Sequence, residues 1–310
     1  MPPLPREERI FFLSLMPFVA ITVAIVVILS AILGYYSLPA IKEYGLGIFS
    51  KEWKPSEINP NEASYGLLIP LAGTIATAVL AVVFTLPVAL GMTALSEEIL
   101  PPQARSLLTV ASDITASIPT IVYGLWGLEI IAPMLRDHLY TWLNKTLGWT
   151  PLFSCNPYTG TTYLTAGLLL GIIVTPYTYA IIRESYRLIP QTLREAAYAM
   201  GSTRYEVFKL LTGMIKPSIV AGILLAFGRA AGETVAVALV IGSAFNMPSC
   251  LLSPGYTISS LIANQFGESF LYPYMANALY TGGLILLAIG MAANVVGLKM
   301  LSLSRGENRG

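Results

Sequence analysis

Arg194-Glu195-Ala196-Ala197-Tyr198-Ala199-Met200-Gly201-Ser202-Thr203-Arg204 forms the centre of a polar, basic stretch that runs from residue 183 to 216. Two long apolar segments flank this stretch. Gly201 is a natural stop for a first short helix, and Ser202 or Thr203 can cap a second one, with Glu206 near its start. The segment therefore predicts two short helices that lie against a membrane and face either a partner or anionic lipid.

The composition around this stretch indicates an integral membrane protein. Hydrophobic residues make up 55% of the 310 residues and charged residues 11%, against about 25% charged in soluble domains. This length leaves room for about six spans of roughly 20 apolar residues. We predict an all-α fold with Pro87 and Pro119 as kink sites. The six predicted spans are Ile10–Tyr36, Leu67–Leu95, Leu107–Leu135, Tyr163–Ile182, Ile219–Phe245 and Tyr274–Leu301.

The distribution of lysine and arginine predicts the orientation. If the amino terminus is cytoplasmic, twelve of the eighteen lie inside, five lie outside, and Arg229 lies within the membrane. The positive-inside rule then places both termini in the cytoplasm of a multi-pass protein of the cell membrane. The predicted parts are a cytoplasmic amino terminus (1–9), a permease domain (10–303) with outer loops at 37–66, 136–162 and 246–273 and a cytoplasmic loop at 183–218, and a cytoplasmic tail (304–310).

Two charges fall inside the fifth predicted span. Arg229 and Glu233 are four residues apart, so they can pair on one helical face. Charges at mid-bilayer are costly and usually face a cavity or a partner. One interpretation is a neutral pair that locks two helices together. The other is a translocation site, with Thr234 beside it, in which Arg229 meets an anion and Glu233 is the resting counter-ion.

The third predicted span contains the run Ser117-Ile118-Pro119-Thr120. Pro119 can open the backbone and leave the hydroxyls of Ser117 and Thr120 near a translocation pathway. A kinked helix that only packs against its neighbours explains the same residues.

The remaining chemistry-bearing residues are few. Cys155 and Cys250 both fall in predicted outer loops, where an oxidising exterior permits a disulfide. Their spacing leaves open whether the two residues meet. His138 is the only histidine, so we expect no metal site. The sequence contains no paired nucleophile and base that would indicate an enzyme. The chain also lacks a Gly-x-x-x-x-Gly-Lys-Ser/Thr loop for ATP.

The pattern Glu195-Ala196-Ala197, followed after three residues by Gly201, resembles the EAA loop of ABC-importer permeases. That resemblance implies a coupling helix that sits in a groove of the ATP-binding subunit. It carries an ATPase-coupling role to Arg194, Glu195, Ala196, Ala197, Gly201 and Arg204. Downstream, Leu211 fits the pattern, whereas Gly213 and Met214 stand where the family has Leu-Pro.

Two further runs resemble the permeases of phosphate importers. They are Ser117-Ile-Pro-Thr-Ile-Val-Tyr-Gly-Leu-Trp-Gly-Leu128 and Gly228-Arg-Ala-Ala-Gly-Glu-Thr-Val-Ala-Val237, and the continuation Val240-Ile241-Gly242 is similar to the PstC type. The resemblance extends over about residues 30 to 300. It implies the fold of a type I ABC importer permease that carries inorganic phosphate inward as one half of a heterodimeric pore.

The same resemblance implies the partners. They are a PstA-type permease, a PstB-type ATPase dimer that holds ATP and Mg, an external PstS-type binding protein and membrane lipid, with no cofactor in this chain and no nucleic acid. Three alternatives stay open: a permease for sulfate or molybdate, the PstA-type partner itself, and an ion-coupled secondary carrier that uses Glu233 as a proton site.

Overall fold

The chain is almost entirely helical, which confirms the all-α prediction. The computed structural model describes residues 6–56, 62–156 and 158–307. In chain order its elements are α1 (Arg6–Tyr44), η1 (Gly45–Phe49), β1 (Trp53–Lys54), β2 (Ser64–Tyr65), α2 (Leu68–Ala94), η3 (Leu95–Ile99), α3 (Pro102–Ser117), α4 (Thr120–Trp126), η4 (Gly127–Ile131), α5 (Ala132–Met134), η5 (Leu135–Tyr140), α6 (Thr141–Leu147), η6 (Pro151–Phe153), α7 (Tyr163–Arg187), α8 (Gln191–Ala199), α9 (Arg204–Met214), α10 (Lys216–Ala231), α11 (Val235–Val240), α12 (Ile258–Gln265), η7 (Ser269–Leu271) and α13 (Met275–Glu307).

Four helical stretches of the described chain are long and apolar enough to cross a membrane, namely Leu13–Phe49, Leu68–Ile99, Tyr163–Arg187 and Met275–Ser302. Two bent helix pairs raise the number to as many as six. Helix α2 continues through Pro87 without a break. Residues 1–5 and 308–310 of the predicted terminal segments lie outside the described residues.

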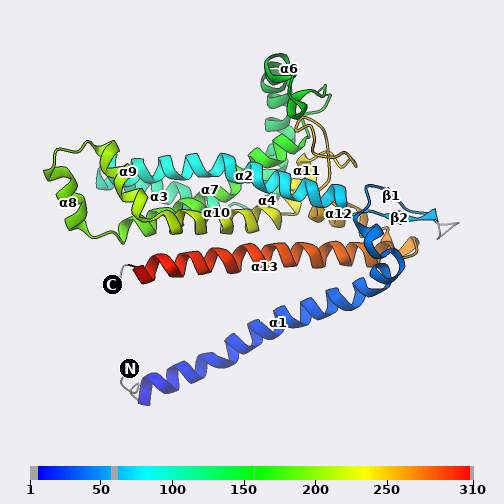
Figure 1. Cartoon of the computed structure of the whole chain (residues 1–310), viewed down its shortest axis with the longest axis horizontal. Coiled ribbons are helices and arrows are strands. Elements are labelled where there is room, and N and C mark those ends of the chain that lie inside the picture. Colours follow the sequence, from blue (N-terminus) through cyan, green and yellow to red (C-terminus); the bar gives the residue numbers. More distant parts are fainter. Residues whose placement is uncertain (1–5, 57–61, 157, 308–310) are drawn as a thin grey trace.

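The first helix is longer than predicted. It continues past Tyr36 to Tyr44, because Ala40 is fully buried and Tyr44 packs edge-on against Tyr65 of the β1–β2 hairpin. Part of the predicted outer loop is therefore helix. In Figure 1, α1 lies beside α13 near the hairpin and diverges from the rest of the molecule toward its amino-terminal end.

The third predicted span is broken rather than kinked. Helix α3 ends at Ser117, α4 begins at Thr120, and the two directions differ by 90°. Ile118 and Pro119 both adopt extended backbone, with ψ of 129° and 136°. Proline disfavours helical backbone in the residue before it and cannot donate within the helix, so the two residues interrupt the span.

The fifth predicted span is also interrupted. Helix α10 ends at Ala231 and α11 begins at Val235, so a continuous helix over 219–245 is wrong. Gly232 and Thr234 have low helix propensity, and they flank Glu233 in the break. The Oγ of Ser259 donates to the carbonyl oxygen of Glu233 at 2.7 Å, which satisfies one of the backbone groups that the break frees.

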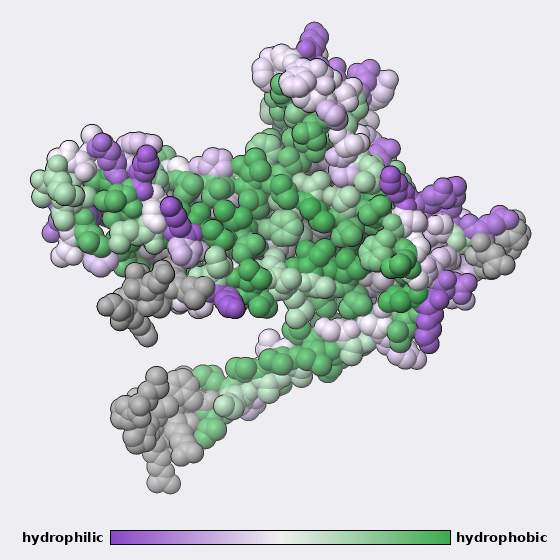
Figure 2. Space-filling model, viewed as in Figure 1, coloured by the Kyte–Doolittle hydropathy of each residue, from purple (hydrophilic) through white to green (hydrophobic). Residues whose placement is uncertain are grey.

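Helices α2, α7 and α10 form the centre of the molecule (Figure 1). A Cβ atom on Gly167 of α7 would lie 2.4 Å from Cβ of Leu80 on α2, so the absence of a side chain lets these helices approach closely. Figure 2 shows an apolar zone over the middle of the molecule, with polar residues gathered at its extremities. This is the surface expected of a protein that spans a bilayer.

Helices α4 and α11 pack against each other directly after the two breaks. A Cβ atom on Gly124 would lie 3.0 Å from Cα of Ala236 and 2.7 Å from a methyl carbon of Leu239. One on Gly127 would lie 2.9 Å from a methyl carbon of Val240. The contacts advance in the same direction along both helices, so their amino-terminal ends lie at the same end of the pair.

We predict that Gly124→Ala lowers the free energy of unfolding by about 1–3 kcal/mol, because the added methyl overpacks the contact with the Ala236 backbone. Gly91→Ala is the matched control, since a Cβ atom there would meet open space. Thermal unfolding of the two purified variants measures the difference. Equal midpoints would contradict the packing described here.

Candidate functional site

The break between α10 and α11 holds the charges that the sequence places in the membrane. Arg229 is exposed in the last turn of α10, and its guanidinium lies 6.0 Å from the ring centre of Tyr177. Glu233 is half-buried in the break itself. The described residues show no ion pair between them, so the pairing that the spacing allows is not formed in this structure. The physical reason is that the helix ends between them, which removes the register that would bring them to one face.

The hydroxyl residues of the predicted pathway lie at the two breaks. Ser117 closes α3 and donates to the carbonyl of Asp113, Thr120 begins α4, and Thr234 precedes α11 and donates to the carbonyl of Gly232. Because α4 and α11 pack in parallel, Thr120 and Thr234 lie at the same end of that pair. In the described chain no hydrogen bond joins Ser117 or Thr120 to the 229–234 segment.

The polar stretch folds as two short helices at one end of the molecule (Figure 1). Gly201, between α8 and α9, has φ of +82°, a conformation that favours glycine. Thr203 caps α9 in a capping box, which confirms the prediction. The N–H and hydroxyl of Thr203 both donate to Glu206 and hold the pKa of that carboxyl below its usual value. The first helix begins only at Gln191, because Pro190 separates it from α7.

The six predicted coupling residues divide into two groups. Glu195, Ala196, Gly201 and Arg204 are exposed, as are the neighbouring Met200 and Tyr205. Ala197 is buried and Arg194 is half-buried, with its guanidinium 5.1 Å from the ring centre of Tyr186. The last two therefore attach α8 to the rest of the chain, whereas the others form an outward surface.

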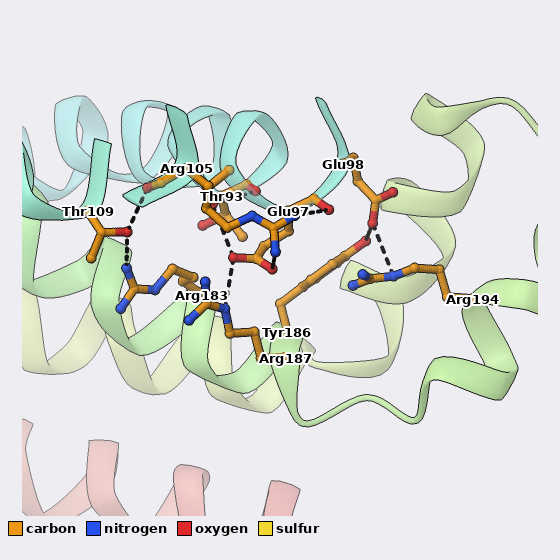
Figure 3. Close-up of polar contacts among 10 residues, drawn as sticks. Thr93, Glu97, Glu98, Arg105, Thr109, Arg183, Tyr186, Arg187 and Arg194 are labelled. Carbon is orange, nitrogen blue, oxygen red and sulfur yellow. Dashed lines mark hydrogen bonds and ion pairs between the residues drawn. The ribbon is translucent and has the colours of Figure 1, made fainter. Parts of the chain in front are cut away.

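Two carboxylates that carry no recognised sequence motif anchor this region (Figure 3). Glu97 and Glu98 lie in η3, and their side chains are only 2% and 4% exposed. Nε of Arg187 lies 2.9 Å from Oε1 of Glu97, and Nη1 of Arg105 lies 3.5 Å from Oε2. The sequence signal for this anchor is a pair of adjacent glutamates directly after an apolar span.

Glu98 connects three helical segments. Its carboxylate accepts hydrogen bonds from the hydroxyls of Tyr186 on α7 and Tyr198 on α8, at 2.5 and 2.6 Å. Nε of Arg194 on α8 lies 3.4 Å from the same carboxylate. Burial and the hydrogen bond to Glu98 raise the pKa of Tyr198. The carboxylate therefore joins η3, which ends the second span, to the first helix of the polar stretch.

Cys155 and Cys250 form a disulfide, with their Cα atoms 6.1 Å apart. It joins the segment after η6 to the loop between α11 and α12 across 95 positions of sequence. A group of three or more His, Cys, Asp or Glu that could hold a metal ion is absent from the described residues.

We predict that Cys250→Ser lowers the free energy of unfolding by about 2–4 kcal/mol, because the bond restricts the unfolded chain. The unfolding midpoint of the parent protein should fall in the presence of reductant, and that of the Cys250→Ser variant should not respond to it. A midpoint that is independent of reductant in both proteins would contradict a stabilising role.

Interrupted helices, charges at an interruption and a polar helix pair at one end define a multi-pass membrane transport protein. The family described as "Binding-protein-dependent transport system inner membrane component" matches residues 99–298, and the chain belongs to this family.

Similar proteins extend the match to most of the chain. One from Methanocaldococcus jannaschii, named probable phosphate transport system permease protein PstC, is 48% identical over 274 residues and covers 87% of each chain. One from Xylella fastidiosa (strain Temecula1), named phosphate transport system permease protein PstC, is 36% identical over 97% of this chain and 94% of the relative.

A solved structure described as inward-facing conformations of the MetNI methionine ABC transporter superposes with a TM-score of 0.50. Its sequence identity is 16%, and the match covers 74% of this chain and 93% of that one. At this identity the likeness shows the shared fold.

Proposed function

We propose that this chain is the membrane-spanning permease subunit of an ATP-driven importer that carries inorganic phosphate into the cell. The observation that carries the proposal is the 48% identity, over 87% of both chains, to a relative named as a phosphate transport permease. The exposed guanidinium of Arg229 at the broken fifth span supports it, because arginine donates two parallel hydrogen bonds to a tetrahedral oxyanion.

Partner chains supply the ATP hydrolysis, the second half of the pore and the delivery of phosphate. ATP and Mg are bound by a separate PstB-type ATPase dimer, a PstA-type permease completes the pore, and a PstS-type protein delivers phosphate from outside. The exposed residues of α8 and the turn after it, Glu195, Ala196 and Gly201, form the surface offered to the ATPase. Arg194 and Glu98 transmit the movement of the ATPase to the end of the second span, because they tie α8 to η3.

Both termini lie on the cytoplasmic side in this proposal. Figure 1 supports this orientation, because the carboxyl-terminal end of α13, the amino-terminal end of α1 and the α8–α9 pair all lie at one end of the molecule, while the β1–β2 hairpin lies at the other. The excess of lysine and arginine in the segments at the first end agrees with the positive-inside rule.

Uptake of radiolabelled phosphate into proteoliposomes tests the proposal. The vesicles hold this chain with its partner permease, ATPase and binding protein, with and without ATP and with excess sulfate. We expect uptake that requires ATP and persists in sulfate. Suppression by sulfate or molybdate would instead assign another oxyanion, and uptake without ATP that follows a proton gradient would assign a secondary carrier centred on Glu233.

A further inference from the structure

Three arginines lie near the α8 end of the bundle, and two of them share one buried carboxylate. Arg105 and Arg187 both approach Glu97, at 3.5 and 2.9 Å. Arg183 donates from Nη1 to Oγ1 of Thr109 at 2.7 Å. Figure 3 shows Arg105 from α3 and Arg187 from α7 meeting at Glu97, with Arg183 turned toward Thr109 beside them. Three guanidinium groups against one carboxylate leave an excess of positive charge at this place.

Neighbouring carboxylates do not neutralise the excess. Glu98 is engaged by Arg194 and two tyrosine hydroxyls. Asp113 on α3 and Glu184 on α7 are exposed, and neither forms an ion pair within the described chain. The net positive charge of Arg105, Arg183 and Arg187 is therefore available to bind an anion from outside this chain.

The arginines also hold donors without acceptors. In the part of the chain that the structure describes, Nε of Arg105 and Nε of Arg183 are buried and donate to no acceptor. A buried donor that is left unpaired is costly. A small rearrangement of either side chain toward a bound anion would give these groups an acceptor.

A pocket of about 280 Å³ adjoins the cluster. Arg105 and Arg187 line it, and their side chains stay 33% and 40% exposed, so a solute can reach them. Ser106 adds a hydroxyl group, whereas that of Thr109 already donates to the carbonyl of Arg105; Pro102, the first residue of α3, also lines the pocket. Guanidinium groups, the Ser106 hydroxyl and the positive end of a 16-residue helix together favour a phosphate group.

We propose that this pocket is a binding site for a phosphate group, separate from the break at Arg229. The group is either the headgroup of an anionic phospholipid or free inorganic phosphate. Basic pockets between helices at a cytoplasmic membrane surface suit lipid headgroups. Because Arg187 and Glu97 hold α7 against η3, occupancy braces the segment that connects to α8. The site stands on this chain's own residues and does not depend on the proposed transport function.

The test uses the full chain in nanodiscs, with the midpoint of thermal unfolding as readout. One arm titrates inorganic phosphate into phosphatidylcholine discs, with chloride at equal ionic strength as reference. The second compares phosphatidylglycerol discs with phosphatidylcholine discs in the absence of phosphate. The decisive variant is Ser106→Asp, which puts a carboxylate into the pocket at an exposed position. Gln103→Asp is its matched control, because it adds the same charge on the same turn outside the pocket lining.

We expect at least one arm to raise the midpoint, and the first arm to do so saturably if phosphate is the ligand. Ser106→Asp should remove the rise or weaken the apparent affinity by at least about tenfold, because a like charge then faces the anion. Gln103→Asp and Arg229→Gln should retain the rise, and the latter separates this site from the translocation break. A rise in the phosphate arm alone assigns free phosphate, and one in the lipid arm alone assigns the headgroup. The proposal is overturned if neither arm exceeds its reference, or if Ser106→Asp behaves like Gln103→Asp.

Discussion

Arg229→Gln is expected to reduce ATP-driven phosphate uptake by roughly a hundredfold, because the loss of charge-assisted hydrogen bonds to an oxyanion costs about 3 kcal/mol. Arg229 lies exposed at the end of α10, and the described chain offers its guanidinium no carboxylate partner. Its charge is therefore available to a passing anion. Uptake into proteoliposomes that hold the complete importer measures the effect.

Two comparisons sharpen this test. Arg136→Gln is the matched control, since Arg136 pairs with the adjacent Asp137 on the surface of η5 and should leave uptake unchanged. Arg229→Lys keeps the charge but loses the planar fork, so an intermediate rate is expected. Unchanged uptake in Arg229→Gln would remove Arg229 from the pathway.

A variant of Glu233 distinguishes a paired Arg229 from an unpaired one. If the two residues formed an ion pair, the double variant Arg229→Gln/Glu233→Gln would recover part of the activity that either single change removes. Because the structure shows no such pair, we expect no recovery, and a double-mutant cycle measures the difference. Recovery of uptake in the double variant would restore the pairing that the sequence suggests.

Glu98→Ala is expected to have the second large effect. The carboxylate is 4% exposed and binds Arg194 and the hydroxyls of Tyr186 and Tyr198. Its removal leaves a buried tyrosine hydroxyl and a half-buried guanidinium without their acceptor, which should cost about 3 kcal/mol of stability. Because the same contacts attach α8 to η3, ATP-driven uptake should also fall. Loss of one hydrogen bond to a charged group, about 1.4 kcal/mol, corresponds to a decrease of about tenfold.

The experiment for Glu98 measures ATP hydrolysis and phosphate uptake together. A coupling role predicts that uptake per ATP hydrolysed falls, a change that loss of folded protein alone would not produce. Glu52→Ala is the control, since the Glu52 side chain is 63% exposed and its carboxylate pairs with the exposed Lys54. An unchanged ratio in Glu98→Ala, with both rates reduced alike, would limit Glu98 to a structural role.

Local sequence signals accounted for the class of fold and for the polar helix pair. Apolar runs of span length predicted the four uninterrupted spans, because the hydrophobic thickness of a bilayer sets a minimum length that composition reveals. Gly201 and the Thr203 capping box predicted the turn between α8 and α9, because the conformations of glycine and of a helix cap depend on adjacent residues only.

Local sequence signals did not predict the two broken spans. By hydropathy, residues 107–135 and 219–245 each form one continuous apolar segment. The breaks at Ile118–Pro119 and around Glu233 are short, and their residues are mostly apolar or small. Their freed backbone groups are tolerated because distant residues satisfy them, as Ser259 does for Glu233. A partner 26 positions away leaves no periodic trace in the sequence.

The sequence by itself determined a helical, multi-pass membrane protein with a capped helix pair and a charged fifth span, since these follow from composition, spacing and nearest neighbours. Only the tertiary structure decided which charges meet. It left Arg229 and Glu233 unpaired, turned Arg194 inward to Glu98, and brought Arg105 and Arg187 to Glu97. The reason is physical: ion pairs form between side chains that packing brings within about 4 Å, and the packing of distant helices is a property of the whole chain.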